Sequence, residues 1–340
     1  MPALYITEPG ATLRLRGRSF LVTDRDDAGG PDKQLLEVEP HTVDLIALVG
    51  AVHVTADALR HCFAHGIPLA WFDREHDLQG RCVPPGDRNG GLRLAQFEAA
   101  TGVERTATIA RAIIGAKIDN SLGLLIDAQG NTPDNALLPV AIAALKDTRA
   151  RLAAAPTLDV LRGLEGAAAS SFFAAFGSAL RPGTGMSFTR RLRRPPPDPV
   201  NALLSFASVL LGNRLASLLE ARGLDPSIGF LHELRSGRPS LALDLLEEWR
   251  APVVERFVLR ACNLRTLRPE HFEADESGQG VRLTRDGLRS FFTEWEKFLL
   301  RPLRGADGTD RAVMPAMAAQ VDALAKALLE RSAYVPFVAR

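Results

Sequence analysis

The sequence predicts an α+β fold, in which a small β-rich N-terminal domain is joined to a larger all-α C-terminal domain. Three features support this prediction. Short apolar runs typical of strands fill the first part of the chain, longer segments with helical spacing of apolar residues follow, and a stretch rich in Pro and Gly at residues 84–91 separates the two. We therefore expect a β-rich domain over residues 1–85 and a helical domain over residues 86–340.

The N-terminal segments show the alternation that half-buried strands require. Residues 12–16 alternate strictly between polar and apolar side chains, and residues 24–32 form a hairpin-type break. One short helix is expected over residues 55–65, with Thr55 as its N-cap and Gly66 just past its end. Short strands at this spacing favour a sandwich-like arrangement. The predicted strands are residues 3–7, 12–16, 19–23, 34–39, 43–49, 51–54, 67–72 and 78–83.

After the separating stretch, apolar residues recur with the period of a helix. In residues 92–128, for example, Leu94 and Ile109 fall on related faces. Two connections carry charge, because residues 190–198 are basic and rich in Pro and residues 270–279 are acidic. The pattern predicts a domain of packed helices. The predicted helices are residues 92–128, 139–154, 157–179, 199–222, 240–261, 284–300 and 314–332.

The composition is that of a globular protein, with 46% hydrophobic and 24% charged residues, which excludes a mainly disordered, collagen-like or coiled-coil chain. The net charge is only +1, but the first 90 residues hold 9 basic and 13 acidic side chains, so the remainder is positive. Most of the basic residues are Arg, whose planar fork matches phosphate geometry. A compositional bias of the source genome explains the same excess.

The sequence lacks the signals that are typical of several protein classes. No apolar run approaches the ~18 residues of a membrane span, and the first residues lack a signal-peptide pattern, so we expect a cytoplasmic protein without membrane contact. The odd, scattered cysteines Cys62, Cys82 and Cys262 fit a reducing compartment. Dinucleotide-binding, P-loop, serine-hydrolase and C-x-x-C motifs are absent from the sequence.

His61 and His65 lie four positions apart at the end of the predicted short helix, a spacing that can chelate zinc. The alternative is an ordinary helix end, where His side chains lie near the negative end of the helix dipole. We favour the alternative, because no third ligand lies nearby in the sequence.

Three segments of the helical part carry residues suited to a divalent cation. Glu165 lies among small residues, His232 ends a short apolar segment after a turn, and Asp244 and Glu247 lie one turn apart on one helix face. Carboxylates with one imidazole suit Mn²⁺ or Mg²⁺, and a dication would reverse the repulsion between the acidic side chains. The alternative for each residue is an ordinary solvated position, with the acidic helix face paired to nearby Arg residues.

The same segments carry a resemblance. The series LEGAAASSFF, RRPPPDPVNALLSFASVLL, LDPSIGFLH and GRPSLALDLLEEWR, in this order and spacing, is similar to the Cas1 family of CRISPR-associated integrases. The resemblance covers essentially the whole chain. The tail at residues 334–337 and the segment at residues 116–120, which contains Lys117, also look like the family.

The resemblance implies that Glu165, His232 and Glu247 bind the catalytic Mn²⁺ or Mg²⁺, and that Asp244 belongs to the same catalytic site, as a ligand or as a supporting residue. Phe172 stands where the family often has Tyr, so no Tyr hydroxyl is available there for DNA.

The resemblance also implies the function. The protein would insert foreign DNA fragments at a CRISPR repeat by attack of the fragment's 3′-hydroxyl on a phosphodiester, and the same site would act as an endonuclease when water replaces the hydroxyl. Double-stranded and branched DNA are the implied substrates. The implied assembly is a homodimer formed through the β-rich domain, with two dimers joined by the small dimeric protein Cas2 into a heterohexamer.

DNA contacts are expected from clustered basic residues beside the candidate site, which would position the duplex without reading its sequence. The alternative is that these side chains are solvated loop charges. Two further functions remain open: a stand-alone structure-specific nuclease, and a non-catalytic DNA-binding scaffold. The candidate DNA-binding residues are Arg190, Arg191, Arg193, Arg194, Arg235 and Arg238, with Asn201 implied by the resemblance.

Overall fold

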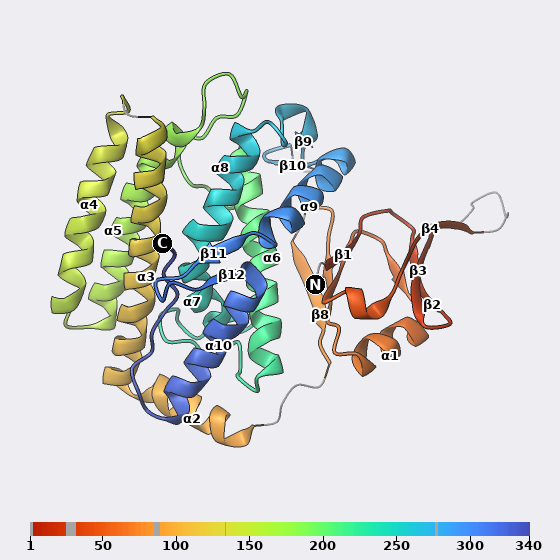
Figure 1. Cartoon of the computed structure of the whole chain (residues 1–340), viewed down its shortest axis with the longest axis horizontal. Coiled ribbons are helices and arrows are strands. Elements are labelled where there is room, and N and C mark those ends of the chain that lie inside the picture. The colour runs from red at the N-terminus through yellow and green to blue at the C-terminus, as the bar shows by residue number, and fades with distance from the viewer. Residues whose placement is uncertain (1–2, 25–31, 76, 85–88, 133, 276–277) are drawn as a thin grey trace.

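The computed structural model places the β-rich N-terminal part beside a mostly helical remainder, so the predicted α+β class is confirmed (Figure 1). The division at residue 85 stays a prediction, because it falls outside the described residues, as do the Gly and Pro of the break at residues 24–32. The structure describes residues 3–24, 32–75, 77–84, 89–132, 134–275 and 278–340.

The strands of the N-terminal part form two sheets of four strands, in the orders β1-β5-β7-β8 and β4-β3-β2-β6. The two sheets and α1 (Ala56–Ala64) enclose a shared apolar core, as a sandwich-like arrangement requires. Pairs β1–β5, β5–β7 and β2–β6 are parallel, which the short spacing did not predict. The strands are β1 Ala3–Ile6, β2 Thr12–Arg16, β3 Ser19–Asp24, β4 Lys33–Val38, β5 Leu45–Val49, β6 His53–Val54, β7 Leu69–Phe72 and β8 Leu78–Cys82.

Strand β5 is buried along its whole length because both faces of its sheet are covered. Ile46 and Leu48 face the core shared with the second sheet. Ala47 and Val49 belong instead to the large core of the helical part. Alternate residues of one strand thus serve two cores, which fits the continuous apolar run of a strand covered on both sides.

The remaining chain forms helices of mostly ten to twenty-nine residues and two small two-stranded sheets, β9–β10 and β11–β12, with long connections at residues 180–198 and 222–239. The helices are α2 Gly90–Thr101, α3 Val103–Asn131, α4 Leu137–Arg151, α5 Leu158–Phe176, α6 Pro199–Ala221, α7 Ser240–Trp249, α9 Arg285–Leu299 and α10 Val313–Leu329, together with the shorter α8 Arg256–Asn263. The strands of the small sheets are β9 Phe272–Ala274, β10 Val281–Leu283, β11 Pro302–Arg304 and β12 Asp310–Ala312.

Two predicted helices are interrupted. The helix expected over residues 92–128 is broken at Gly102, whose extended backbone separates α2 from α3. The helix expected over residues 240–261 contains a π-helical segment, Arg250–Glu255, between α7 and α8. Pro252 lies within this segment, and because Pro lacks a backbone donor it disfavours a continuous α-helix there.

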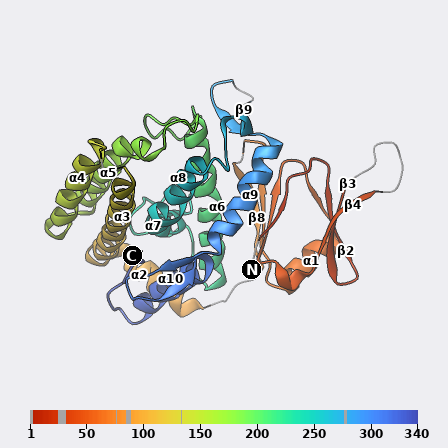
Figure 2. The ribbon, with the colours of Figure 1, turned by 45° about the horizontal axis from the view of Figure 1, so that its top comes forward.

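Helix α6 joins the two parts of the molecule. It is long and apolar enough to cross a membrane, but 67% of its most apolar window is buried inside the structure, as in the core helix of a soluble protein. Its buried Arg214 pairs with Glu296 of α9 at 3.0 Å and Asp44 at 3.4 Å. Tyr5 of β1 donates to Glu296 at 2.6 Å, so charge and hydrogen bonds fix the sheet against the helices; Figure 2 shows α9 beside that sheet.

Candidate metal and nucleic-acid site

Helices α3, α5 and α7 bring the predicted acidic residues together. Lys117 of α3 pairs with Glu165 of α5, and its ammonium also lies 2.6 Å from Glu247 of α7. The Lys117 side chain is only 12% exposed. Gly166 beside Glu165 is exposed, whereas Ala168 of the same helix is buried against the core. Two carboxylates from separate helices therefore share one cation.

The electrostatics of this cluster favour its charged form. Burial alone would raise the pKa of Glu247, but Lys117, Arg250 and His232 outweigh it and hold that pKa well below its usual range. Burial likewise opposes the charge on Lys117, yet Glu247 and Glu165 raise its pKa. Glu247 is thus a carboxylate and Lys117 an ammonium at neutral pH.

His232 is oriented by Asp244, which is fully buried in α7. The Asp244 carboxylate accepts the backbone N–H groups of Phe230 at 2.5 Å and Leu231 at 2.9 Å on one oxygen. Its other oxygen accepts the backbone N–H of His232 at 2.9 Å and the ring Nδ1 at 2.7 Å. This arrangement leaves ring Nε2 as the atom that can bind a cation, as in carboxylate–histidine–metal sites.

The turn before His232 depends on Gly229. A Cβ atom at this position would lie 2.6 Å from the Asp244 carboxylate and 2.9 Å from the backbone of Ser240. Any side chain would therefore push the turn away from α7, and with it His232. Gly229 belongs to the segment LDPSIGFLH, which is part of the family resemblance. The close approach explains why a residue without a side chain is needed at this position.

The donor set fits a divalent cation, although no group of three or more His, Cys, Asp or Glu side chains stands in ligating geometry within the described part of the chain. The Lys117 ammonium pairs with both Glu165 and Glu247 and so lies where these two carboxylates meet. A position that stabilises one positive charge between two carboxylates suits a hard cation as well. Glu165, Glu247 and His232 would hold it.

Arg250, the first residue of the π-helical segment, borders this cluster. Its Nε lies 3.3 Å from Glu255 and 3.8 Å from Glu247. Burial opposes its charge, but these two carboxylates raise its pKa. Arg250 also lines a cavity of about 850 Å³ between α6, α7 and the β7–β8 turn, so the acidic cluster lies next to a groove.

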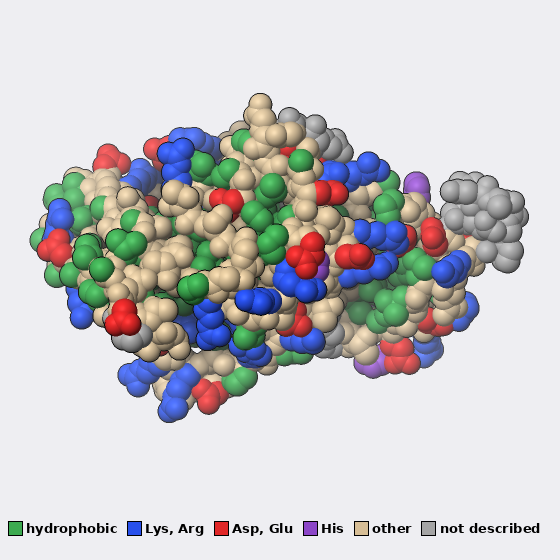
Figure 3. Space-filling view, turned by 90° about the horizontal axis from the view of Figure 1, so that it is seen from above, with side chains coloured by type: hydrophobic (Ala, Val, Ile, Leu, Met, Phe, Trp, Pro, Cys, Tyr) green, Lys and Arg blue, Asp and Glu red, His purple; other side chains and the backbone are tan. Residues whose placement is uncertain are grey.

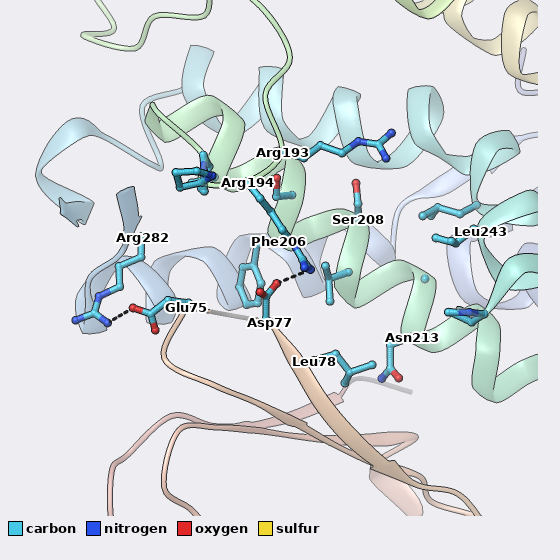
Figure 4. A pocket seen from close by; sticks show the side chains of 18 of the residues that line it. Glu75, Asp77, Leu78, Arg193, Arg194, Phe206, Ser208, Asn213, Leu243 and Arg282 are labelled. Atoms are coloured by element: carbon cyan, nitrogen blue, oxygen red, sulfur yellow. Dashed lines mark hydrogen bonds and ion pairs between the residues drawn. The ribbon is translucent and has the colours of Figure 1, made fainter. Parts of the chain in front are cut away.

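Figure 4 shows two ion pairs at the mouth of this groove. Asp77 pairs with Arg194 at 3.0 Å, and Glu75 pairs with Arg282 at 2.8 Å. In both pairs the carboxylate comes from the β7–β8 turn and the arginine from the helical part. The groove floor is apolar, with Phe206 among its side chains. Carboxylates of the N-terminal part thus neutralise two arginines that line the groove.

The predicted DNA-binding residues separate into two groups. Arg190, Arg193, Arg194 and Arg235 are exposed, and Arg238 is half-buried. Figure 3 shows that Lys and Arg side chains on one face form several patches interspersed with acidic ones, rather than one basic field.

Asn201 is completely buried. Its Oδ1 accepts from Arg191 at 2.9 Å and from the backbone N–H of Leu192, and its Nδ2 donates to Asp198 at 2.7 Å and the Arg190 carbonyl. Burial lowers the pKa of Arg191 to about 10, with Arg250 adding to the effect. Asn201 therefore holds the arginine loop, and its burial leaves no side-chain atom for direct DNA contact.

The histidine pair of α1 stays outside this site. The rings of His61 and His65 lie 4.0 Å apart between centroids, and the His65 ring contacts the His61 carbonyl at 2.8 Å. The described residues provide no third ligand there. The ordinary helix end stays a prediction for this pair.

Comparison with known proteins identifies the family. Residues 4–297 match the family model described as CRISPR associated protein Cas1. The chain belongs to the Cas1 family. CRISPR-associated endonuclease Cas1 2 of Rhodospirillum rubrum is 38% identical over 304 residues, which cover 86% of this chain and 85% of that protein. CRISPR-associated endonuclease Cas1 1 of Thermus thermophilus is 35% identical over 336 residues, 98% of each chain.

Solved structures agree with this assignment. A Cas1 protein from Thermotoga maritima superposes with a TM-score of 0.79 at 25% identity, covering 97% of both chains. A casposase bound to an integration product gives a TM-score of 0.83 at 23% identity, covering 99% of this chain and 93% of the other, which is a likeness of fold. The resemblance seen in the sequence is therefore confirmed.

One departure from the Cas1 pattern has a structural explanation. Phe172 is buried against Phe173 and Phe176, with ring centroids 5.1 Å and 5.6 Å away. A closed aromatic cluster of this kind needs no hydroxyl. Phe172 therefore packs as a core residue of α5.

Sequence reasoning missed a third buried carboxylate on α7, Glu248. Glu248 accepts the Tyr334 hydroxyl at 2.6 Å and the Phe337 backbone N–H at 2.8 Å. Trp249 stacks on Phe337 with ring centroids 4.2 Å apart. Asn120 donates to the carbonyls of Glu248 and Phe337. The tail at residues 334–337, which the sequence marked only as similar to the family, is thus fixed behind the helix that carries Glu247.

Proposed function

We propose that this protein is a metal-dependent DNA integrase of CRISPR adaptation, which joins the 3′-hydroxyl of an incoming DNA fragment to a phosphodiester at the end of a CRISPR repeat. The observation that carries the proposal is the pair of carboxylates, Glu165 and Glu247, that share one cation position beside an Asp-oriented His232. The endonuclease names of its relatives and the casposase-like fold support it.

The residues of this site have two roles, binding the metal and orienting the residues that bind it. Glu165, Glu247 and Nε2 of His232 bind Mn²⁺ or Mg²⁺, which when bound supplies Lewis-acid stabilisation of charge on the phosphate. Asp244 has all of its described contacts within the turn, so it orients His232 instead of ligating. Because the attacking group belongs to DNA or water, the site needs no Ser or Cys nucleophile.

DNA would reach this site along the groove beside α6 and α7. Arg193 and Arg194 line it, Arg190 is exposed close to them in the chain, and Arg235 is exposed in the segment that follows His232. Arg191, held by Asn201, lines the wall. These side chains would contact phosphates and position double-stranded or branched DNA without reading its sequence.

The implied assembly is a homodimer bridged by Cas2 into a heterohexamer. The edge strand β4 supports dimerisation through the β-rich part, because it exposes Leu35 and Leu36 and its outer edge is unpaired in its sheet. A solved assembly titled Cas6-RT-Cas1--Cas2 complex contains a chain with this fold at a TM-score of 0.79 and 23% identity; this chain covers 35% of that chain.

The deciding experiment is a strand-transfer assay on labelled duplex and branched DNA, with Mn²⁺, Mg²⁺ or a chelator, with and without Cas2. We expect metal-dependent joined strands with the wild type and none with Glu165→Ala. Glu104→Ala, an exposed carboxylate of α3, is the matched control and should retain joining.

The same assay separates the other two functions. Shortened strands without joined products, unchanged by Cas2, would indicate a stand-alone structure-specific nuclease. DNA binding without any product would indicate a non-catalytic scaffold.

The arginines have a test of their own. Replacing Arg193 and Arg194 by Ala should weaken DNA binding and flatten its dependence on salt, because fewer counterions are released. Arg151→Ala, which changes an exposed arginine of α4, is the matched control. An unchanged salt slope would remove both arginines from the interface.

A further inference from the structure

The position of Lys117 has a consequence for the proposed metal site. Its ammonium reaches carboxylates of two other helices, Glu165 and Glu247, and its side chain is almost entirely withdrawn from solvent. Such a lysine is stable only if its charge is compensated, and the two carboxylates are the groups that compensate it. The reverse also holds: without Lys117, two acidic side chains would face each other with no cation between them.

The neighbouring Arg250 does not take over this role. Its guanidinium is closer to Glu255, at 3.3 Å, than to Glu247, at 3.8 Å. Arg250 is therefore shared between Glu255 and Glu247, and Lys117 is the cation that pairs with both Glu165 and Glu247. Those two carboxylates and Lys117 together carry one net negative charge. A dication added while Lys117 stays in place would meet a positive charge only one ligand away.

We propose that Lys117 is a resident counter-cation of the Glu165–Glu247 pair, which a divalent metal must displace in order to bind. Lys117 thereby stabilises the metal-free fold and weakens the affinity of the site for metal. This inference rests on the proposed function, because it concerns the same carboxylates. It assigns to Lys117, which is not itself a metal ligand, control over the affinity of the site for the metal.

The test measures Mn²⁺ binding to the full chain without DNA, by the loss of the paramagnetic resonance signal of the free ion. We expect Lys117→Met to bind Mn²⁺ about tenfold or more tightly than the wild type, since like charges ~4 Å apart interact strongly even at an effective dielectric constant of ~20. Lys117→Arg, which keeps the charge, should stay near the wild type. Lys146→Met, an exposed lysine of α4, is the matched control.

Thermal unfolding gives an independent readout. Without metal, Lys117→Met should melt below the wild type, because the two carboxylates lose their cation. Saturating Mn²⁺ should close that difference, because the dication then compensates the carboxylates in both proteins.

A measurement on the wild type avoids any folding defect of the variant. The chain contains only five lysines, so ¹⁵N-lysine labelling gives few side-chain signals, and Lys117→Arg identifies the signal of Lys117. We expect saturating Mg²⁺ to shift or remove the Nζ signal of Lys117 and to leave the others in place. An unchanged signal at saturating Mg²⁺ would overturn the inference.

The outcomes distinguish this inference from the proposed function. Tighter binding by Lys117→Met supports it, including the case in which only the variant binds measurably. Equal or weaker binding by the variant overturns it and leaves the metal-dependent function intact. If neither protein binds Mn²⁺, both the inference and the metal dependence of the proposed function fail.

Discussion

Glu247 and Glu248 are neighbours in α7 and both are buried, yet the two faces of the helix stabilise them in opposite ways. Glu247 faces Lys117 and Arg250, and these cations lower its pKa despite burial. Glu248 faces neutral donors from the C-terminal tail, and burial raises its pKa to about 8. The comparison shows that one helix can present two different faces. The face with Glu247 contacts cations, which another cation can replace, whereas the face with Glu248 contacts only neutral hydrogen-bond donors.

The largest expected effect separates the two faces by activity. Glu247→Gln should reduce DNA joining by about 100-fold or more, because a metal ligand is lost. Glu248→Gln should keep most of the joining activity, because its side chain does not reach the site. Equal loss of joining in both variants, measured by initial rates at saturating metal, would break the comparison.

The contacts of Glu248 with the C-terminal tail should contribute to the stability of the fold. Glu248→Ala leaves the Tyr334 hydroxyl and the Phe337 N–H without their acceptor and opens a cavity, so we expect a loss of about 2–4 kcal/mol in unfolding free energy. Denaturant unfolding measures this loss. Glu98→Ala, an exposed carboxylate paired with Arg331, should change the same quantity by less than about 0.5 kcal/mol. A tail that stays protected from proteolysis in Glu248→Ala would contradict its anchoring role.

The turn that carries His232 should give a smaller effect on stability. Gly229→Ala forces a Cβ against Asp244 and Ser240, so we expect a loss of about 1–3 kcal/mol together with weaker Mn²⁺ binding. Gly163→Ala in α5 meets open space and should gain about 0.5–1 kcal/mol, since Ala favours a helix over Gly. Unchanged metal affinity in Gly229→Ala would show that the turn does not position His232.

The smallest effect concerns the groove beside the charged face. Asp77→Asn removes an exposed ion pair, so stability should change by less than about 1 kcal/mol. Arg194 is then free for phosphate, and DNA should bind a few-fold more tightly at low salt, an advantage that disappears at high salt because exposed charges are screened. Asp147→Asn, paired with Arg151 on α4, is the control and should leave DNA affinity unchanged.

The fold class could be predicted because it depends on local patterns: alternation in the first part, helical periodicity in the rest. The order of strands could not, because the parallel pairing of β1 with β5 and β7 depends on long-range contacts. The break at Gly102 was missed for a related reason, since a single Gly inside an amphipathic pattern does not by itself end a helix.

The candidate site shows the same limit. Acidic residues one turn apart, Asp244 and Glu247, were visible in the sequence, but their different tasks follow from the backbone N–H groups that surround Asp244. The pairing of Lys117 with Glu165 and Glu247 depends on how three helices pack. Glu248 next to Glu247 looks equally acidic in the sequence, and only its burial against the tail distinguishes it.

The two-faced strand β5 has a consequence for how the chain unfolds. Ala47 and Val49 complete the core of the helices, while Ile46 and Leu48 complete the core of the sheets. Neither core can open without exposing half of the same strand. We therefore expect one cooperative transition for both parts of the molecule, with coincident loss of far-ultraviolet and tryptophan signals. An isolated N-terminal fragment would present an apolar face to solvent and tend to associate.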